Sequence, residues 1–103
     1  QNKGVKTAWL AFPLVIKNNK IKRANLQIFL EKRGIQTRTI FTGNILRQPI
    51  MKKKKYFKHK KSEIVSNDIM RNGILIGCHH GLTKKNLEYI CKSFILFLNK
   101  KAN

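Results

Sequence analysis

The C-terminal stretch from Thr83 onward constrains the fold more than any other part of the sequence. Apolar residues recur there three or four positions apart, the spacing that places side chains on one face of an α-helix. They are Leu87, Ile90, Cys91, Phe94, Phe97 and Leu98. Thr83 is a suitable N-cap, and Lys100 and Lys101 suit the negative end of the helix dipole. The pattern predicts a long amphipathic helix that buries its apolar face, Cys91 included.

Three upstream segments are typical of β-strands. Residues 7–16 and 74–77 are apolar and about one strand long, and residues 35–41 alternate apolar and polar side chains. That alternation puts Arg38 on one face of its strand, between neighbours that point to the other face. Because Pro13 has no N–H to give to a sheet, the first segment is expected at a sheet edge or at a bulge.

Two further segments, 22–34 and 62–73, are predicted to be helical. In the first, apolar residues follow the helical spacing, and Gly34 is placed to end the helix in the left-handed conformation. Its start is poorly capped, because Lys22 stands where Ser or Asp would serve. Residues 42–61, between the second strand and the second helix, are expected to be irregular.

The element order β-α-β-loop-α-β-α predicts an α+β fold: a small three-stranded sheet with helices packed on one face. A chain of 103 residues buries one modest core, so residues 1–103 are expected to form a single domain. So thin a layer gains stability by packing against another domain. The sequence starts without Met or a signal-peptide core, and we expect it to be the C-terminal fragment of a longer chain.

The charge is strongly positive, with 23 Lys and Arg against 4 Asp and Glu. Seven lysines crowd into Lys52–Lys61, which predicts a basic, exposed loop. Tyr56 and Phe57 within it could stack on bases, so a lysine-rich module that binds nucleic acid or anionic surfaces is one hypothesis. Its competitor is compositional drift in an AT-rich genome, because Lys, Ile and Asn dominate together and Arg, the usual base reader, is scarce.

The run Cys78-His79-His80 follows a predicted strand and precedes the last helix. Adjacent histidines on an extended chain point to opposite sides, and structural zinc needs four spaced ligands, so no metal site is predicted. Cys78 and His79 are too close in sequence to form an oriented thiol–base pair, and no catalytic residue is expected in these residues. Helix N-termini favour anionic ligand groups. The histidines are therefore either satisfied loop residues or ligand contacts.

No apolar run approaches the length of about 20 residues that spans a bilayer. Two cysteines are too few for a disulfide framework, which favours reduced thiols and a cytoplasmic location.

Three blocks of the sequence, read in order, resemble a known family. They are AWLAFPLVIK, RANLQIFLEKRGIQTRTIFTGNILRQP and IMRNGILIGCHHGLTKKNLEYI. Together they cover nearly the whole chain and resemble the C-terminal region of the DegT/DnrJ/EryC1/StrS family of pyridoxal-phosphate-dependent sugar aminotransferases. Within it they look closest to nucleotide-sugar 3-dehydrases of the CDP-4-keto-6-deoxyglucose type, from lipopolysaccharide biosynthesis. The lysines at 52–61 and the poor cap at Lys22 depart from the family pattern.

The resemblance implies the small C-terminal domain of the fold-type-I aminotransferase fold, which would contribute one wall of a nucleotide-sugar pocket and be inactive alone. Five residues in the matching motifs become candidates for substrate binding. They are Arg38, Asn44, Arg47, His79 and His80.

The resemblance also implies PLP or PMP in the full-length parent, anchored by a large domain that precedes these residues, and a homodimer. Some of the 3-dehydrases carry an iron–sulfur cluster, which would belong to the parent only, because Cys78 and Cys91 do not match its ligands. Transamination and dehydration both remain open.

Overall fold

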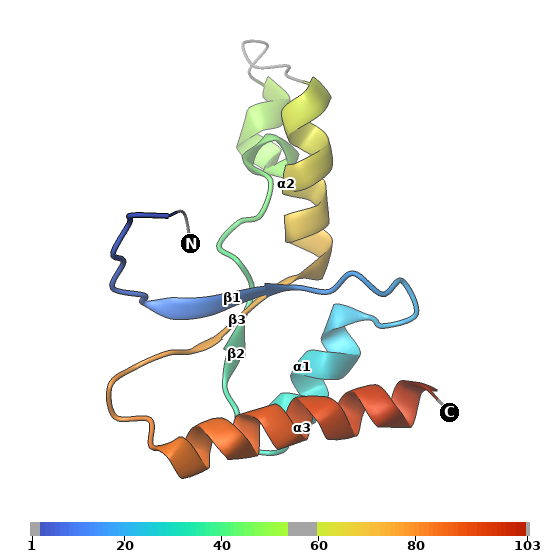
Figure 1. Cartoon of the computed structure of the whole chain (residues 1–103). Helices are drawn as coiled ribbons and strands as arrows, with labels where there is room; N and C mark the ends of the chain where they lie inside the picture. The colour runs from blue at the N-terminus through green and yellow to red at the C-terminus, as the bar shows by residue number, and fades with distance from the viewer. Residues whose placement is uncertain (1–2, 54–59, 103) are drawn as a thin grey trace.

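Three short strands form one antiparallel sheet in the computed structural model, which describes residues 3–53 and 60–102. They are β1 (Ala11–Val15), β2 (Thr37–Arg38) and β3 (Gly73–Gly77), in the order β1-β3-β2 (Figure 1). β1 lies at one edge, as expected from Pro13. Both outer strands are shorter than predicted, β2 most of all. Phe41, at the end of the second predicted strand, takes a positive φ of 43°, which is incompatible with a strand there.

The pairing register decides which side chains face the core. Ile74 lies opposite Leu14, and Ile76 lies opposite both Phe12 and Thr37. Ile74 and Ile76 are buried, so this set faces inward. Leu75, between them, lies opposite Pro13 and Arg38 and faces the other side. Arg38 is therefore on the outer face of the sheet, opposite to the face of its neighbour Thr37.

Two helices, α1 (Arg23–Glu31) and α3 (Lys84–Ala102), cover the inner face (Figure 1). The core between them and the sheet contains six buried apolar residues: Ile21, Leu26, Leu30, Ile35, Ile74 and Phe97. Burial of this apolar surface is the main stabilising term. The predicted α+β fold with a small three-stranded sheet is confirmed.

The end of α1 follows the sequence prediction. Gly34 has a φ of +73°, its N–H donates to Glu31 O, and Ile35 N–H donates to Leu30 O. These two bonds satisfy the last carbonyls of the helix in a Schellman arrangement. At the other end, Lys22 makes no side-chain capping bond, as expected.

α3 is held against α1 by Arg33 (beyond the end of α1). Its Nε donates to Ser93 Oγ at 2.9 Å, and its guanidinium lies 5.7 Å from the ring centre of Phe29 and 5.1 Å from that of Tyr89. Tyr89 Oη donates in return to Arg33 O at 3.0 Å. Cation–π contacts and a hydrogen bond to a charged group thus join the two helices.

The prediction that Cys91 is buried is wrong. Cys91 is exposed, and the fully buried residue of α3 is Ser93, whose hydroxyl both accepts from Arg33 and donates to Tyr89 O. The reason is that α1 covers only one flank of α3. Leu87 and Leu98, on the other flank, are 50% and 47% exposed.

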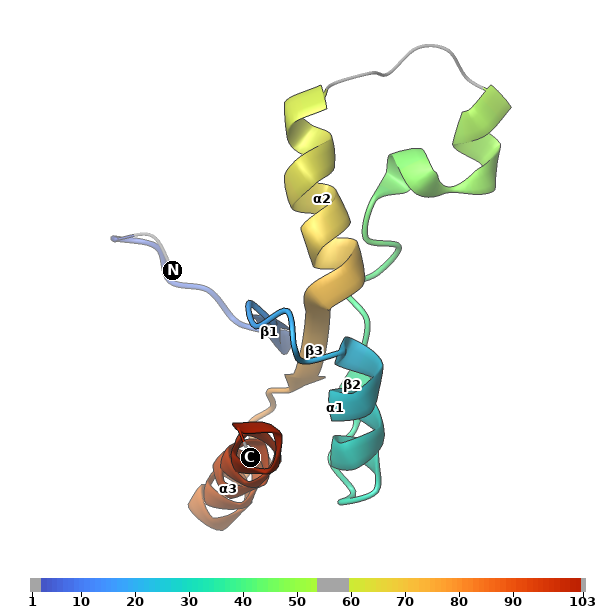
Figure 2. The same cartoon turned by 90° about the vertical axis from the view of Figure 1, so that its right-hand side faces the viewer.

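α2 (Lys60–Asn72) runs directly into β3 and contributes no residue to the core just described. It points away from the sheet on the side opposite α1 and α3 (Figure 2). Carbonyls at the junction of α2 and β3 accept hydrogen bonds from α1 and from the residue after β1. Arg23 Nη1 donates to Met70 O at 2.6 Å and to Gly73 O at 3.2 Å, and Ile16 N–H donates to Asn72 O. These bonds satisfy groups that a helix end leaves unpaired.

Residues 42–61 were expected to be irregular, and the structure corrects this in part. Short 3₁₀ helices occupy Ile45–Arg47 (η1) and Pro49–Lys53 (η2), and α2 already begins at Lys60. Asn44 caps the first, and Pro49, with its fixed φ, starts the second. The centre of the predicted basic loop, with Tyr56, Phe57 and His59, lies outside the described residues.

Among the helices that the structure describes, none is long and apolar enough to cross a membrane.

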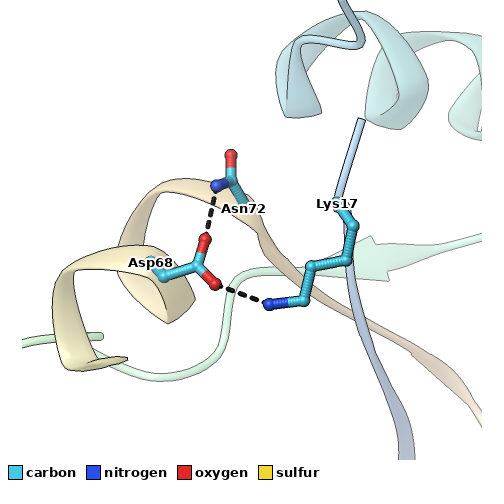
Figure 3. Close-up of polar contacts among 3 residues, drawn as sticks. All are labelled: Lys17, Asp68 and Asn72. Atoms are coloured by element: carbon cyan, nitrogen blue, oxygen red, sulfur yellow. Dashed lines mark hydrogen bonds and ion pairs between the residues drawn. The ribbon is translucent and has the colours of Figure 1, made fainter. Parts of the chain in front are cut away.

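Asp68 links α2 to the chain after β1 (Figure 3). Lys17 Nζ donates to its Oδ2 at 2.8 Å, and Asn72 Nδ2 donates to its Oδ1 at 2.6 Å. The hydrogen bond from Lys17, then that from Asn72, lowers the pKa of Asp68 below its ordinary value of 3.8. Because the folded-state pKa is depressed, the contribution to stability is present above the ordinary value and is lost as the pH falls through the folded value.

We therefore expect Asp68→Asn to flatten the acid limb of stability. Urea midpoints measured between about pH 6 and pH 2 should fall less steeply for this variant than for the wild type. The reason is that the variant lacks the carboxylate that takes up a proton when the wild type unfolds at acid pH. Lys17→Met, which removes the first donor, should flatten the limb in part. Identical slopes for all three proteins would show that the contact contributes nothing in solution.

Candidate functional site

Asn44 and Arg47 lie beside α2 and share one partner. Asn44 is almost fully buried, at 2% exposure; its Nδ2 donates to Asn67 Oδ1 at 3.0 Å and its Oδ1 accepts from Leu46 N–H at 3.0 Å. Arg47 Nε donates to the same Asn67 oxygen at 3.1 Å. The Asn44 side chain is thus occupied by capping η1 and by fixing Asn67, which in turn orients the guanidinium of Arg47.

The approach of this segment to α2 depends on Gly43. It has a φ of +68°, and a Cβ added to it would lie 2.5 Å from Cβ of Met70. Both facts require glycine, because an L side chain is strained at this φ and the helix leaves no room for one.

Arg38 stands apart from that cluster, on the outer face of the sheet. Its side chain is exposed, and the guanidinium makes no hydrogen bond or ion pair with the rest of the described chain. All its donors are therefore available. A guanidinium presents them in the planar fork that matches a phosphate or carboxylate.

His79 and His80 form the turn between β3 and α3, as predicted, and both are exposed. Gly81 N–H donates to His79 Nδ1 at 3.2 Å, so the neutral ring carries its proton on Nε2 and presents that N–H as a donor. Thr83 then caps α3: its hydroxyl accepts from Asn86 N–H while Asn86 Oδ1 accepts from Thr83 N–H. This reciprocal pair resembles a capping box.

A groove of about 490 Å³ opens beside this turn, between the sheet and the uncovered flank of α3. Trp9 and Phe12 line it from β1 and the residues just before that strand, and Leu87 and Cys91 line it from α3; both histidines are also among the lining residues. No carboxylate and no lysine is among the lining residues. In the described part of the chain, no three His, Cys, Asp or Glu side chains gather where they could hold a metal ion.

The five predicted site residues therefore do not form one cluster. Asn44 and Arg47 lie beside α2, His79 and His80 follow the end of β3, and Arg38 pairs with the middle of β3. Sequence reasoning missed Asn67 and the lining role of Trp9. One feature of the sequence could have indicated Asn67: it is an Asn in the interior of a predicted helix, and Asn is a poor helix former.

The fold and site define a class of protein: a small α+β domain with an unpaired arginine on its sheet and an open groove along one helix. The chain belongs to the DegT/DnrJ/EryC1/StrS aminotransferase family, whose sequence model matches residues 1–95. Two curated relatives agree with this assignment.

One relative is the lipopolysaccharide biosynthesis protein RfbH of Salmonella typhimurium, 35% identical over 89 residues, which cover 84% of this chain and 20% of the relative. The other is the dTDP-4-dehydro-2,6-dideoxy-D-glucose 3-dehydratase of Saccharopolyspora spinosa, 30% identical over 97 residues, 92% of this chain and 21% of that enzyme. The chain thus spans about a fifth of the length of these relatives.

Gly43→Ala tests the close approach that positions Asn44. We expect it to lower the free energy of unfolding by about 2 kcal/mol or more, since it adds backbone strain and a clash with α2. Gly77→Ala is the matched control, because no atom lies within 4 Å of its added Cβ and its φ is ordinary. Denaturant titration of both variants measures the difference. Equal stability of the two would mean that the segment does not pack on α2 in this way.

Proposed function

We propose that the chain is the C-terminal domain of a PLP- or PMP-dependent enzyme that acts on a nucleotide-linked deoxysugar, as a 3-dehydrase or an aminotransferase, in lipopolysaccharide O-antigen biosynthesis. The observation that carries the proposal is the family match over residues 1–95. The names of the two relatives, one a lipopolysaccharide biosynthesis protein and one a nucleotide-sugar 3-dehydratase, support the substrate class and favour dehydration.

In this proposal the chain binds and orients the substrate. Arg38 contacts an anionic group such as a phosphate through its unpaired donors, and Arg47, oriented by Asn67, binds a second acceptor. His79 donates its Nε2–H to the ligand, and the adjacent His80 is a further contact. Asn44 acts as a positioning residue, because its amide is already engaged on both sides.

The described residues do not form a cradle for the cofactor. Every lysine whose exposure the structure gives is exposed, and two of the four acids are engaged: Glu31 accepts from Thr37, and Asp68 from Lys17 and Asn72. We therefore assign the anchoring of PLP or PMP, and of any iron–sulfur cluster, to the upstream part of a longer cytoplasmic, homodimeric parent.

A fusion tests the proposal. The matching region of the S. spinosa dehydratase is replaced by residues 1–103, and turnover of dTDP-4-dehydro-2,6-dideoxy-D-glucose is followed for the fusion, for the truncated enzyme without the region and for this chain alone. We expect turnover by the fusion only. Turnover by the isolated chain, or none by a folded fusion, would contradict the proposal.

Within the fusion, Arg38→Ala should raise KM for the nucleotide sugar by about 10-fold to 100-fold, the range expected when a hydrogen bond to a charged group is lost. A smaller change in kcat is expected, because the contact holds the substrate and does not touch the reacting atoms. Arg71→Ala, an exposed arginine on α2, is the control and should leave KM unchanged. Equal KM values for both variants would remove Arg38 from the site.

A second candidate is the binding of polyanions, favoured by the formal net charge of +19. Within the described residues, 3–53 and 60–102, the structure contains one ion pair, Lys17–Asp68. The positive charge of these residues is therefore largely uncompensated. Binding of this kind should weaken steeply with salt and show no base preference.

A further inference from the structure

The junction of α2 and β3 contains the one Asn-Gly pair of the sequence, Asn72-Gly73. Asparagine is a thermolabile residue, and an asparagine before glycine can change the chain itself. The backbone nitrogen of the glycine attacks the side-chain carbonyl carbon and ammonia leaves. The five-membered succinimide ring so formed takes up water and opens to aspartate or to isoaspartate. Glycine favours the attack because it has no Cβ to hinder the approach. The pair is therefore a candidate site of modification.

In the folded domain both reacting residues are restrained. Asn72 Nδ2 donates to Asp68 Oδ1 at 2.6 Å, which holds the amide over the preceding turn of α2, and Asn72 O accepts from Ile16 N–H at 3.1 Å. Gly73 is buried, and its carbonyl accepts from Arg23 Nη1 at 3.2 Å. The attack needs the Asn72 amide to swing onto the next peptide nitrogen, and opening of the ring needs water at a buried main chain. Both steps require the junction to open.

Each residue of the labile pair has a structural role. A Cβ added to Gly73 would lie 2.5 Å from Ile69 O and 2.7 Å from Ile40 Cδ1, so no larger residue fits where the helix meets the strand. Asn72 supplies a hydrogen-bond donor to the carboxylate of Asp68. The packing that requires this pair is also the packing that restrains it.

We propose that Asn72-Gly73 is a modification site protected by the closed junction, and that Asn72 converts to aspartate and isoaspartate when the junction opens while the rest of the domain stays folded. The reaction needs only water as its second reactant. One molecule of water enters, one of ammonia leaves, and no oxidation state changes. The inference is independent of the proposed function.

The products disrupt the junction. Isoaspartate carries the main chain through its side chain and adds one carbon to the backbone between α2 and β3, which displaces the register that sets Gly73 opposite Val15. Either product also replaces the amide donor of Asn72 by a carboxylate that faces the carboxylate of Asp68. Opening of the junction thus leads to irreversible loss of the folded state by chemical modification.

Peptide mass spectrometry measures the reaction. The 103-residue chain is incubated at neutral pH, both below its urea midpoint and in strong urea, and is then cut after lysine. Residues 62–84 form one peptide, whose fragments separate Asn72 from Asn67. We expect Asn72 to react about 100-fold more slowly in the folded chain than in urea, because only the open fraction reacts. Equal rates would overturn the protection.

The chemistry is tested in urea, where the fold plays no part. Gly73→Ala should slow the reaction of Asn72 there, because the added Cβ hinders the attacking nitrogen. An unchanged rate would overturn the attack by the backbone nitrogen of residue 73.

Arg23→Ala tests whether the opening is local to the junction. Arg33→Ala, which removes a guanidinium between α1 and α3, is the matched control. Urea is added until both variants have the same free energy of unfolding. We expect Asn72 to react about 10-fold faster in Arg23→Ala, since the junction has lost hydrogen bonds from a charged group. Equal rates at matched stability would show that only global unfolding exposes the pair, and would overturn the local opening.

Asp68→Ala is a second variant that leaves Arg23 in place. It frees the Asn72 amide, and at the same matched stability it should also raise the rate by about 10-fold over Arg33→Ala. A rate equal to that of Arg33→Ala would overturn the restraint by Asp68.

Discussion

The arrangement of the whole domain depends on the Arg23 guanidinium at the junction of α2 and β3. No loop separates the helix from the strand, so the last carbonyls of α2 must find donors elsewhere. Arg23 supplies them from the start of α1, and Ile16 from the end of β1. One junction thereby fixes the central strand, the edge strand and the first core helix relative to each other, and the sheet can then present Ile74 and Ile76 to the core.

Local signals in the sequence predicted the elements well. Gly34 and Thr83 mark the ends of helices through backbone geometry that depends on the residue itself, and Pro13 marks the sheet edge for the same reason. Burial was predicted less well. The spacing on α3 predicted a buried Cys91. An apolar stripe is buried only where another element packs on it, and the hydrogen bond from Arg33 to Ser93 turns the Ser93 side of α3 toward α1 instead. That pairing spans 60 positions and leaves no periodic signal.

In the candidate site, too, local motifs were predictive and long-range contacts were not. The family motifs directed attention to Asn44 and Arg47, and both lie together beside α2, but Asn67, the amide that joins them, is 23 and 20 positions away and was not predicted. The sequence alone also could not separate a ligand contact from a positioning contact. The structure adds that Asn44 is 2% exposed and that both ends of its amide are engaged, which is the basis for proposing it as a positioning residue.

The absence of a loop between α2 and β3 has a mechanical consequence. A helix of 13 residues and a strand of 5 follow each other directly, as α2 and β3 show in Figure 2. The Arg47–Asn67 hydrogen bond lies on the helix, and the His79 turn comes just after the strand. Because no flexible segment lies between them, the bonds from Arg23 to Met70 O and Gly73 O hold the end of the helix and the start of the strand with one side chain.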